Sequence, residues 1–245
     1  MKINPLYIIP NLFTAASAFL GVSSIIYAIN GRIEFACWLV IISMILDGLD
    51  GRVARITNTA SKFGVEFDSL CDLVAFGCAP AILIYLAFGH NYGRFGLVVS
   101  CLFVVFGAIR LARFNIITSN ESSHFFIGLP IPSAAIFVVT MLILEKRYNV
   151  LSTHNFWLLV FTFIVGILMV SNIRYPNFKH IRWNLFKMII AIVILSVLFI
   201  LPVEGIFSGI SAYVMYGILR YTYILGAKVI FKRKIKNDLN QKDEK

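Results

Sequence analysis

The sequence predicts an all-α, polytopic membrane protein with about eight transmembrane helices and both termini in the cytoplasm. Three observations support this prediction. Of the 245 residues, 59% are hydrophobic and only 14% are charged, whereas a soluble domain has roughly a quarter charged residues. The mean hydropathy is +0.85. The apolar residues gather in runs long enough to cross a bilayer, and short polar segments separate these runs.

The first half of the chain contains four apolar runs of about the length that a bilayer requires. The predicted spans are 11–29, 33–53, 67–88 and 95–113. Pro10 precedes the first span, and proline is favoured at the first position of a helix. The third span contains Pro80 partway along. These runs predict two consecutive pairs of membrane-crossing helices.

The second half of the chain is less regular. The run at 125–144 is apolar but is interrupted by Gly128, Pro130 and Pro132. We expect a short helix after an extended segment, which membrane depth tolerates only where the backbone is buried in protein or lines a cavity. The remaining predicted spans are 156–171, 183–201 and 206–230. The chain is therefore predicted to form a single membrane domain, 1–230, followed by a polar, basic tail, 231–245.

The distribution of basic residues predicts the orientation in the membrane. Arg32, Arg94, Lys146 and Arg147 fall on one side of the eight-span arrangement, and the rest of the 22 basic residues fall on the other side or at its edge. The positive-inside rule places the richer side in the cytoplasm. We therefore expect a multi-pass protein of the cytoplasmic (inner) membrane with its active site facing the cytoplasm. The net charge of +10 then reflects topology and anionic lipids, and no nucleic-acid binding is predicted.

Four aspartates lie at the facing ends of the second and third spans. Asp47 and Asp50 are three residues apart, and Asp68 and Asp72 are four apart, so each pair shares one face of its helix. The short connection between the pairs lacks apolar periodicity and ends in Gly64. This pattern predicts a tight helix–loop–helix that brings four carboxylates together.

Such a cluster favours a bound cation. Four ionised carboxylates repel one another strongly at low dielectric, and a divalent cation removes this conflict. An all-oxygen ligand set favours Mg²⁺ or Mn²⁺ over zinc. Gly51 leaves the backbone beside the aspartates open to a bulky ligand, and the small side chain of Ala54 leaves the next turn of the helix accessible too. Arg55 can present a guanidinium fork to a phosphate. The stretch therefore predicts a metal–diphosphate site.

The same residues resemble the motif of the CDP-alcohol phosphotransferase family, D-x-x-D-G-x-x-A-R-x8-G-x-x-x-D-x-x-x-D, and they match it at every position. Members of this family are similar in a six-helix core. They use a divalent metal while an alcohol displaces CMP from a CDP-linked group. The resemblance implies the same core, the same reaction class and a homodimer for this chain.

The resemblance also implies roles for individual residues. The implied metal ligands are Asp47, Asp50, Asp68 and Asp72. Asp72 is implied to be a metal ligand, the catalytic base, or both. The residues implied to line the CDP pocket are Gly51, Ala54, Arg55, Gly64, Ser61, Asn11 and Thr14. For Asn11 and Thr14, which lie in PNLFT, a simple helix-capping role is the alternative.

Three further segments resemble the phosphatidylserine synthase branch of the family: GAIRLARFN at 107–115, FIGLPIPSAA at 126–135 and MVSNIRYPNFK at 169–179. This resemblance implies CDP-diacylglycerol and L-serine as substrates. Serine offers a carboxylate and an ammonium group, so Arg110, Arg113 and Asn115 are candidate serine-binding residues. The alternative for each arginine is an anchor whose head group extends to the lipid interface.

Other functions remain open at this point. Within the family, the acceptor can be another alcohol, such as glycerol 3-phosphate or inositol phosphate. A membrane prenyltransferase also holds a metal–diphosphate with aspartates, but its two aspartate motifs normally lie far apart in the chain. An ion transporter places its carboxylates near the bilayer midplane at broken helices, whereas the aspartates here lie at helix ends.

Overall fold

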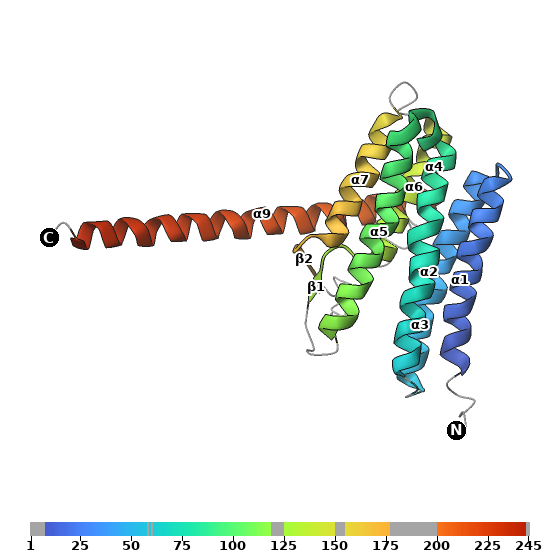
Figure 1. The fold of residues 1–245 in the computed structure, drawn as a ribbon, viewed down its shortest axis with the longest axis horizontal. Helices are drawn as coiled ribbons and strands as arrows, with labels where there is room; N and C mark the ends of the chain where they lie inside the picture. The colour runs from blue at the N-terminus through green and yellow to red at the C-terminus, as the bar shows by residue number, and fades with distance from the viewer. Residues whose placement is uncertain are drawn as a thin grey trace.

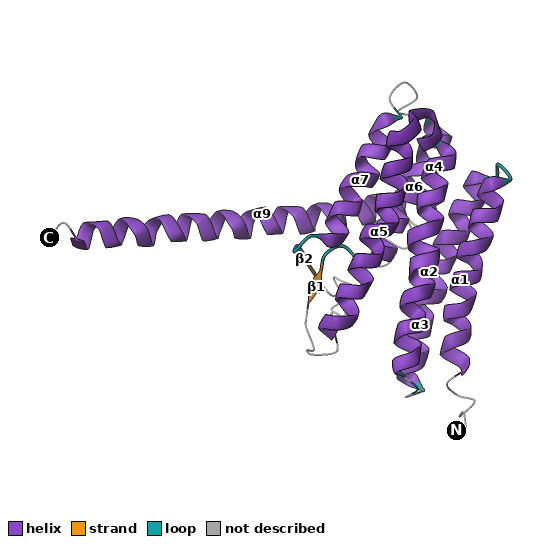
Figure 2. Cartoon of the chain, in the orientation of Figure 1, coloured by secondary structure: helices purple, strands orange, loops and turns teal. Residues whose placement is uncertain are grey.

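The computed structural model describes residues 8–57, 59, 61–118, 125–149, 155–176 and 200–243. In these residues the chain forms a helical bundle with a single small sheet (Figures 1 and 2). In chain order the elements are α1 (Ile8–Ile29), α2 (Ile33–Ile56), α3 (Lys62–Asp72), the π-helix η2 (Leu73–Cys78), α4 (Ala79–Ala87), the 3₁₀-helix η3 (Gly89–Tyr92), α5 (Gly93–Thr118), β1 (Phe125–Ile127), α6 (Ile131–Tyr148), α7 (Phe156–Val170), β2 (Arg174–Pro176) and α9 (Pro202–Asp243).

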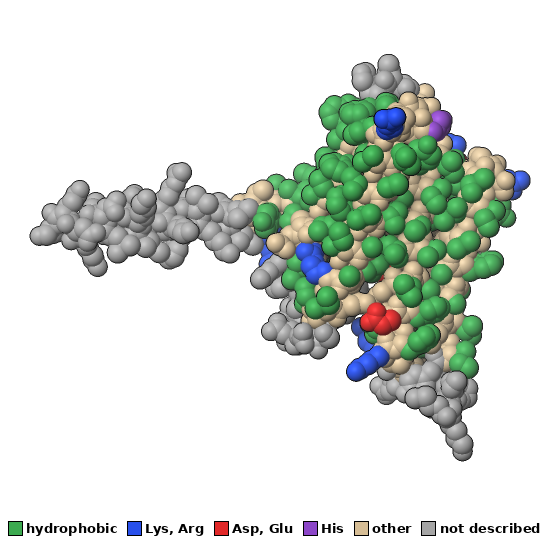
Figure 3. All heavy atoms as spheres, viewed as in Figure 1, with side chains coloured by type: hydrophobic (Ala, Val, Ile, Leu, Met, Phe, Trp, Pro, Cys, Tyr) green, Lys and Arg blue, Asp and Glu red, His purple; other side chains and the backbone are tan. Residues whose placement is uncertain are grey.

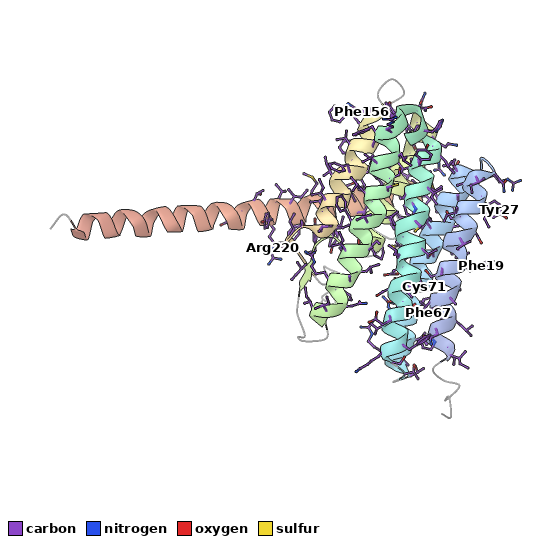
Figure 4. All side chains as sticks on the ribbon, in the orientation of Figure 1. Phe19, Tyr27, Phe67, Cys71, Phe156 and Arg220 are labelled. Atoms are coloured by element: carbon purple, nitrogen blue, oxygen red, sulfur yellow. The ribbon has the colours of Figure 1, made fainter. Side chains whose placement is uncertain are left out.

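The prediction of an all-α polytopic membrane fold is confirmed. Within the described ranges, four helical stretches are long and apolar enough to cross a membrane: Ile8–Ile29, Lys62–Ala87, Gly89–Ile117 and Pro202–Tyr223. Hydrophobic side chains cover most of the visible face of the bundle (Figure 3). Phe19 points away from it (Figure 4) and is 71% exposed. Such an apolar outer surface is suited to lipid rather than to water.

The other predicted spans differ in outcome. Helices α2 and α6 lie where spans were predicted, but both carry several charged residues near one end. Helix α7 is apolar and has 15 residues, which is short for a full crossing. The predicted span 183–201 lies outside the described residues except for its last two positions. The number of eight spans and the cytoplasmic location of the termini stay predictions.

The connection between the two aspartate pairs is shorter than the sequence predicts. Helix α2 continues to Ile56, and α3 begins at Lys62. The expectation that Gly64 ends the connection is wrong, because Gly64 lies in the first turn of α3. The reason is Ser61, an N-cap whose side-chain oxygen accepts a hydrogen bond from the Gly64 backbone N–H at 3.0 Å. The start of α1, the end of α2 and the start of α3 therefore meet at one end of the bundle (Figure 1).

The predicted third span is one continuous helical stretch with a change of winding. Helices α3 and α4 are joined by η2, where the Ala79 backbone N–H donates to the Val74 carbonyl, five residues earlier. Pro80 has no N–H with which to bond the Phe76 carbonyl, and its ring would clash with that carbonyl in a regular α-helix. The wider π-helical turn accommodates the proline without ending the helix.

The extended segment predicted before α6 is also present. Strand β1 pairs with β2 in antiparallel fashion, and Phe126 lies opposite Tyr175. Gly128 follows with φ +80°, a left-handed conformation that glycine adopts readily, and its N–H donates to the Ile173 carbonyl at 2.8 Å. The chain then turns into α6 at Pro130. At the other end of the chain, α9 continues to Asp243, well beyond the predicted limit at 230.

Candidate functional site

An acidic cluster forms where α2 and α3 face each other. Asp47, Asp50 and Asp68 each offer a carboxylate oxygen, and these atoms all lie within 4.8 Å of one another. Asp50 is buried, and Asp47 and Asp68 are half-buried. Helix α3, which carries Asp68, also carries the labelled Phe67 and Cys71 in the lower part of the bundle (Figure 4). The predicted convergence of the two aspartate pairs is therefore present in the fold.

Asp72 lies one turn deeper than Asp68 and is 8% exposed. It is not part of the three-carboxylate group, but its carboxylate lies within hydrogen-bonding reach of the Asp47 carboxylate. The Arg110 guanidinium interacts electrostatically with both aspartates. Two carboxylates in such close contact require a shared proton or a neighbouring positive charge. Asp72 therefore lies between the acidic cluster and a buried cation.

The acidic cluster fits a divalent cation. Asp68 Oδ1 and Asp72 Oδ1 are buried and have no hydrogen-bond partner among the described residues, although buried polar atoms are nearly always paired. The oxygens of Asp47, Asp50 and Asp68 converge closely enough to share one ion. A hard cation with oxygen ligands suits this set. These aspartates can therefore hold a metal ion.

A cavity of about 210 Å³ opens beside the cluster. Its lining comes from the start of α1, the end of α2, the connection after α2 and the start of α3. The lining residues are Pro10, Asn11, Thr14, Asp50, Gly51, Ala54, Arg55, Thr59, Ser61, Gly64, Val65 and Asp68. All of the residues that the family resemblance places around CDP are on this wall. The cavity therefore joins the predicted nucleotide residues to the acidic cluster.

Two glycines keep this cavity open. No atom lies within 4 Å of a Cβ built on Gly51, so the backbone beside Asp50 faces open space. A Cβ on Gly64 would lie 3.2 Å from Ser61 Oγ and 3.4 Å from Asn11 Oδ1. A side chain at 64 would thus crowd the first turn of α3 against α1. Glycine at both positions leaves room for a ligand at the helix ends.

Thr14 acts on the acidic cluster directly. Its hydroxyl donates to Asp50 Oδ2 at 2.6 Å, and it also lies 3.2 Å from the Pro10 carbonyl. Because Thr14 is buried, this bond orients the Asp50 carboxylate from the first helix. Asn11 lies at the cavity wall one turn earlier. The capping alternative for Thr14 is thus not the contact that the fold displays.

Arg55 lies at the exposed rim of the cavity. Its Nε donates to the Gly51 carbonyl at 2.8 Å, so the side chain folds back along α2. The rest of the guanidinium is exposed and remains available to a ligand. This geometry is compatible with the predicted phosphate contact.

The predicted serine-binding residues have different surroundings. Arg113 donates to main-chain carbonyls at the end of α7 and at the end of β1: Val170 at 2.9 Å, Ile127 at 3.0 Å, Ser171 at 3.1 Å and Met169 at 3.3 Å. The Asn115 amide nitrogen donates to Ser69 Oγ at 3.0 Å and Glu66 Oε2 at 3.2 Å. These contacts tie α5 to its neighbours, and for Arg113 they do not favour a role in binding serine.

Arg110 is different, although it precedes Arg113 by less than one turn of α5. It is 6% exposed, and no hydrogen bond joins its guanidinium to any residue that the structure describes. Its Cζ lies 5.0 Å from the centre of the Phe114 ring. A buried guanidinium is costly unless an anion lies close to it. Arg110 is therefore the strongest of the three candidates.

Comparison with known proteins agrees with this geometry. Residues 7–169 match the family model of the CDP-alcohol phosphatidyltransferases. The chain belongs to this family. It is 53% identical over 234 residues to a Helicobacter pylori protein named CDP-diacylglycerol–serine O-phosphatidyltransferase, covering 95% of this chain and 98% of the relative.

More distant relatives of this CDP-alcohol phosphatidyltransferase come from archaea. A Methanocaldococcus jannaschii protein named CDP-diacylglycerol–serine O-phosphatidyltransferase is 37% identical over 75% of this chain and 82% of the relative. A Methanothermobacter thermautotrophicus protein named archaetidylserine synthase is 37% identical over 72% of each chain. The family match contains the acidic cluster and the whole cavity wall, whereas β2 and α9 lie beyond it.

Some residues at the site of this family member were not predicted. Thr59, Val65 and Pro10 line the cavity, and Thr59 is buried in the connection after α2, where its backbone N–H donates to the Ala54 carbonyl at 2.9 Å. Thr59 falls within the unspecified gap of the motif, although a cluster of Thr and Ser between two helices is itself a turn signal. Tyr213, on α9, interacts electrostatically with Arg110 and was not predicted either.

Proposed function

We propose that this protein is a phosphatidylserine synthase. It transfers the phosphatidyl group from CDP-diacylglycerol to the hydroxyl of L-serine and releases CMP. The observation that carries the proposal is the acidic cluster beside a cavity whose wall contains Asp50, Gly51, Ala54, Arg55, Gly64 and Asp68 of the family motif. The names of relatives that match over most of the chain support serine as the acceptor.

Asp47, Asp50 and Asp68 hold Mg²⁺ or Mn²⁺ in this proposal. A divalent cation bound there supplies positive charge for the diphosphate oxygens and for the CMP leaving group. Asp50 is oriented for this task by the Thr14 hydroxyl. Asp72, which has one buried oxygen without a described partner, stands beside them as a fourth ligand, as the general base, or as both.

The nucleotide occupies the cavity between α1, α2 and α3. Gly51 and Ala54 let the diphosphate approach the α2 backbone, and Arg55 pairs with a phosphate through its free guanidinium nitrogens. Ser61, Gly64, Asn11 and Thr14 also line this cavity. The diacylglycerol part extends sideways into the inner leaflet, because the outer surface of these helices is apolar.

The reaction is a direct displacement at phosphorus. Asp72 accepts the proton of the serine hydroxyl as that oxygen attacks the β-phosphorus. The new bond joins the serine oxygen to phosphorus, the bond between phosphorus and the CMP oxygen breaks, and CMP leaves with the electron pair. Arg110 binds the serine carboxylate close to Asp72. Asn115, which lies near the end of α5, is kept as a weaker candidate for the same substrate.

The cellular arrangement is part of the proposal. The enzyme lies in the cytoplasmic membrane with the cavity facing the cytoplasm, because the excess of basic residues is on that side. Serine then reaches the site from the cytosol and CDP-diacylglycerol from the inner leaflet. A homodimer is proposed on family resemblance.

Release of CMP by the purified protein tests this function. The protein is given CDP-diacylglycerol and Mg²⁺ or Mn²⁺ with serine, glycerol 3-phosphate or inositol phosphate in parallel reactions. We expect CMP release with serine and formation of phosphatidylserine. Preferential CMP release with another alcohol would show that this alcohol, and not serine, is the acceptor. Competition by a prenyl diphosphate but not by CDP would favour a prenyltransferase.

A further inference from the structure

Helices α1 and α2 are joined by hydroxyl groups that are buried between them. The side-chain oxygens of Ser17, on α1, and Ser43, on α2, are 2.8 Å apart. The Ser43 hydroxyl also donates to the Ser17 main-chain carbonyl at 3.1 Å. Because a hydroxyl has a single proton to donate, Ser43 uses it on the carbonyl, and Ser17 then donates to Ser43 Oγ. This hydroxyl pair, Ser17 and Ser43, therefore ties α2 to both the backbone and a side chain of α1.

The hydroxyl pair lies about one helical turn from the acidic cluster. Ser43 precedes Asp47 by one turn and Asp50 by two turns, so the three side chains lie on one face of α2. On α1, Ser17 follows Thr14 by one turn, and Thr14 donates to Asp50 Oδ2 at 2.6 Å. Both serines and Thr14 are buried. These contacts hold one face of α2 against one face of α1 directly beside the proposed metal ligands.

The buried row of α1 also packs against the stretch that carries the other aspartates. Gly21, one turn beyond Ser17, approaches η2 so closely that a Cβ built on it would lie 2.6 Å from Ala75 Cα. Ala75 follows Asp72 by one turn. Helix α1 is thus a common support for α2 and for the stretch that runs from α3 into η2. A shift of α2 along α1 would therefore change the separation between the two aspartate pairs.

Directional contacts determine the axial position of α2 on α1. In a membrane, apolar packing between helices gains little over contact with lipid tails, so hydrogen bonds between helices contribute to their association. A hydrogen bond weakens steeply when its donor or acceptor is displaced, and two such bonds in the hydroxyl pair resist sliding of α2. A functional site requires its side chains to be held within about 0.5 Å of the productive geometry. The hydroxyl pair is placed to supply that precision.

We propose that Ser17 and Ser43 are positioning residues that hold α2 in the register at which Asp47 and Asp50 converge with Asp68 on a divalent cation. This inference rests on the proposed function, which assigns the cation to these aspartates. Neither serine lines the nucleotide cavity, and each acts through the position of α2. The pair also lies outside the family motif, because both residues precede its first aspartate.

The test measures the affinity for Mn²⁺ by calorimetric titration of the purified protein without nucleotide. Ser43→Ala removes both hydrogen bonds of the pair, and we expect the Kd for Mn²⁺ to rise about tenfold, at the lower end of the range for residues that support metal ligands. Ser17→Ala keeps the bond from Ser43 to the Ser17 carbonyl and should raise the Kd about threefold, since one neutral hydrogen bond is lost. The double variant should match Ser43→Ala, because the two residues act as one pair.

Ser24→Ala is the matched control. Ser24 is as buried as Ser43 and donates to the Ala36 carbonyl across the same interface at 2.8 Å, but Ala36 lies about three turns of α2 before Asp47. Ser24→Ala should lower the melting temperature by a few degrees, as Ser43→Ala does, and leave the Kd for Mn²⁺ unchanged. At saturating Mn²⁺, Ser43→Ala should regain most of its turnover, whereas Asp47→Asn should not.

An unchanged Kd in Ser43→Ala, or an equal rise in Ser24→Ala, would overturn the inference and leave the hydroxyl pair with a role in packing only. These results differ from a failure of the proposed function. If the unmodified protein binds Mn²⁺ but releases no CMP with L-serine, the proposed acceptor is wrong, while the Kd values still decide the role of the hydroxyl pair. If the unmodified protein binds no Mn²⁺, the proposed metal site and the inference are both wrong.

Discussion

The nucleotide side and the acceptor side of the site are built in different ways. The nucleotide side, meaning the acidic cluster and the cavity, comes almost entirely from residues 47–72 and the start of α1. The proposed acceptor side, meaning Arg110 and Asn115, lies on α5, and Asn115 bonds Ser69 and Glu66 of α3, which are more than 40 residues away in the chain. Residues close in sequence form a motif that can be recognised, whereas an assembled side exists only once the bundle has packed.

The two arginines near the end of α5 sharpen this contrast. Arg113 donates hydrogen bonds to the carbonyls of Val170, Ile127, Ser171 and Met169. Arg110 makes no hydrogen bond to a described residue and interacts electrostatically with Asp72. Identical side chains three residues apart therefore differ in their surroundings: Arg113 holds the end of α7 and the small sheet, and Arg110 is the one proposed to bind the acceptor.

The largest expected effect is on the nucleotide side. Asp47→Asn or Asp68→Asn removes a ligand charge without changing side-chain volume, and we expect turnover to fall by about 10³-fold or more. CMP release by the purified protein measures this, and EDTA should reproduce the loss reversibly. Glu34→Gln is the control, because Glu34 lies at the opposite end of α2 and pairs with Arg147. Full activity in stringent chelator would refute the role of the metal.

Asp72 tests whether binding and proton transfer are separate. Asp72→Asn should keep binding of CDP and Mn²⁺ but lose roughly 10²–10⁴-fold in transfer to serine, the range expected for loss of a general base. Asp47→Asn should lose both properties. Calorimetric titration of each purified variant, beside a turnover assay, decides the matter. If the two variants lose binding equally, Asp72 is mainly a ligand, and Asp68 becomes the next candidate for the base.

The arginine pair gives the third prediction. Arg110→Lys replaces a fork by a point charge and should raise the KM for serine about tenfold or more with little change in melting temperature. Arg113→Lys should instead lower the melting temperature by several degrees, because several hydrogen bonds to buried carbonyls are lost. Kinetics and thermal melting of both variants measure the contrast. The reverse pattern would exchange the roles of the two residues.

Arg55 gives the smallest expected effect, because it is exposed and already bonded to the Gly51 carbonyl. Arg55→Lys should raise the KM for CDP-diacylglycerol by a factor of about three to ten, since a bidentate contact with phosphate is lost. The KM for serine should change much less. Arg52→Lys, an exposed neighbour outside the cavity wall, is the control. If Arg55→Lys changed only the KM for serine, Arg55 would belong to the acceptor side of the site.

Much of the nucleotide side could be predicted because helical geometry alone brings its residues together. The spacing of Asp47 and Asp50, and of Asp68 and Asp72, determines the face on which each pair lies, and a short connection forces those faces to meet. The role of Arg113 could not be predicted, since it depends on carbonyls at the end of α7, which only tertiary packing brings near α5. The ring contact of Tyr213 with Tyr175 depends on packing in the same way.

Helix boundaries followed the same rule. The start of α2 matches the prediction at residue 33 because the NGR turn interrupts the apolar pattern there. The start of α3 was misplaced because Ser61, a capping residue, determines it. Local apolar pattern thus predicted the helices, while single side-chain contacts decided where they begin.

The π-helical segment η2 has a consequence for how this protein tolerates change. It lies directly after Asp72 and before the tightly packed α4. Its wider turn therefore changes the angular relation between the side chains of α3 and those of α4 along one continuous helical stretch. The carboxylates that precede it in the chain and the buried side chains that follow it, such as Leu83 and Ile84, need not obey a common helical periodicity. Substitutions in either α3 or α4 can therefore change the packing of that helix while the other helix keeps its orientation. Deleting one residue of η2 would restore a regular α-helical pitch and rotate Asp68 and Asp72 relative to the rest of the bundle.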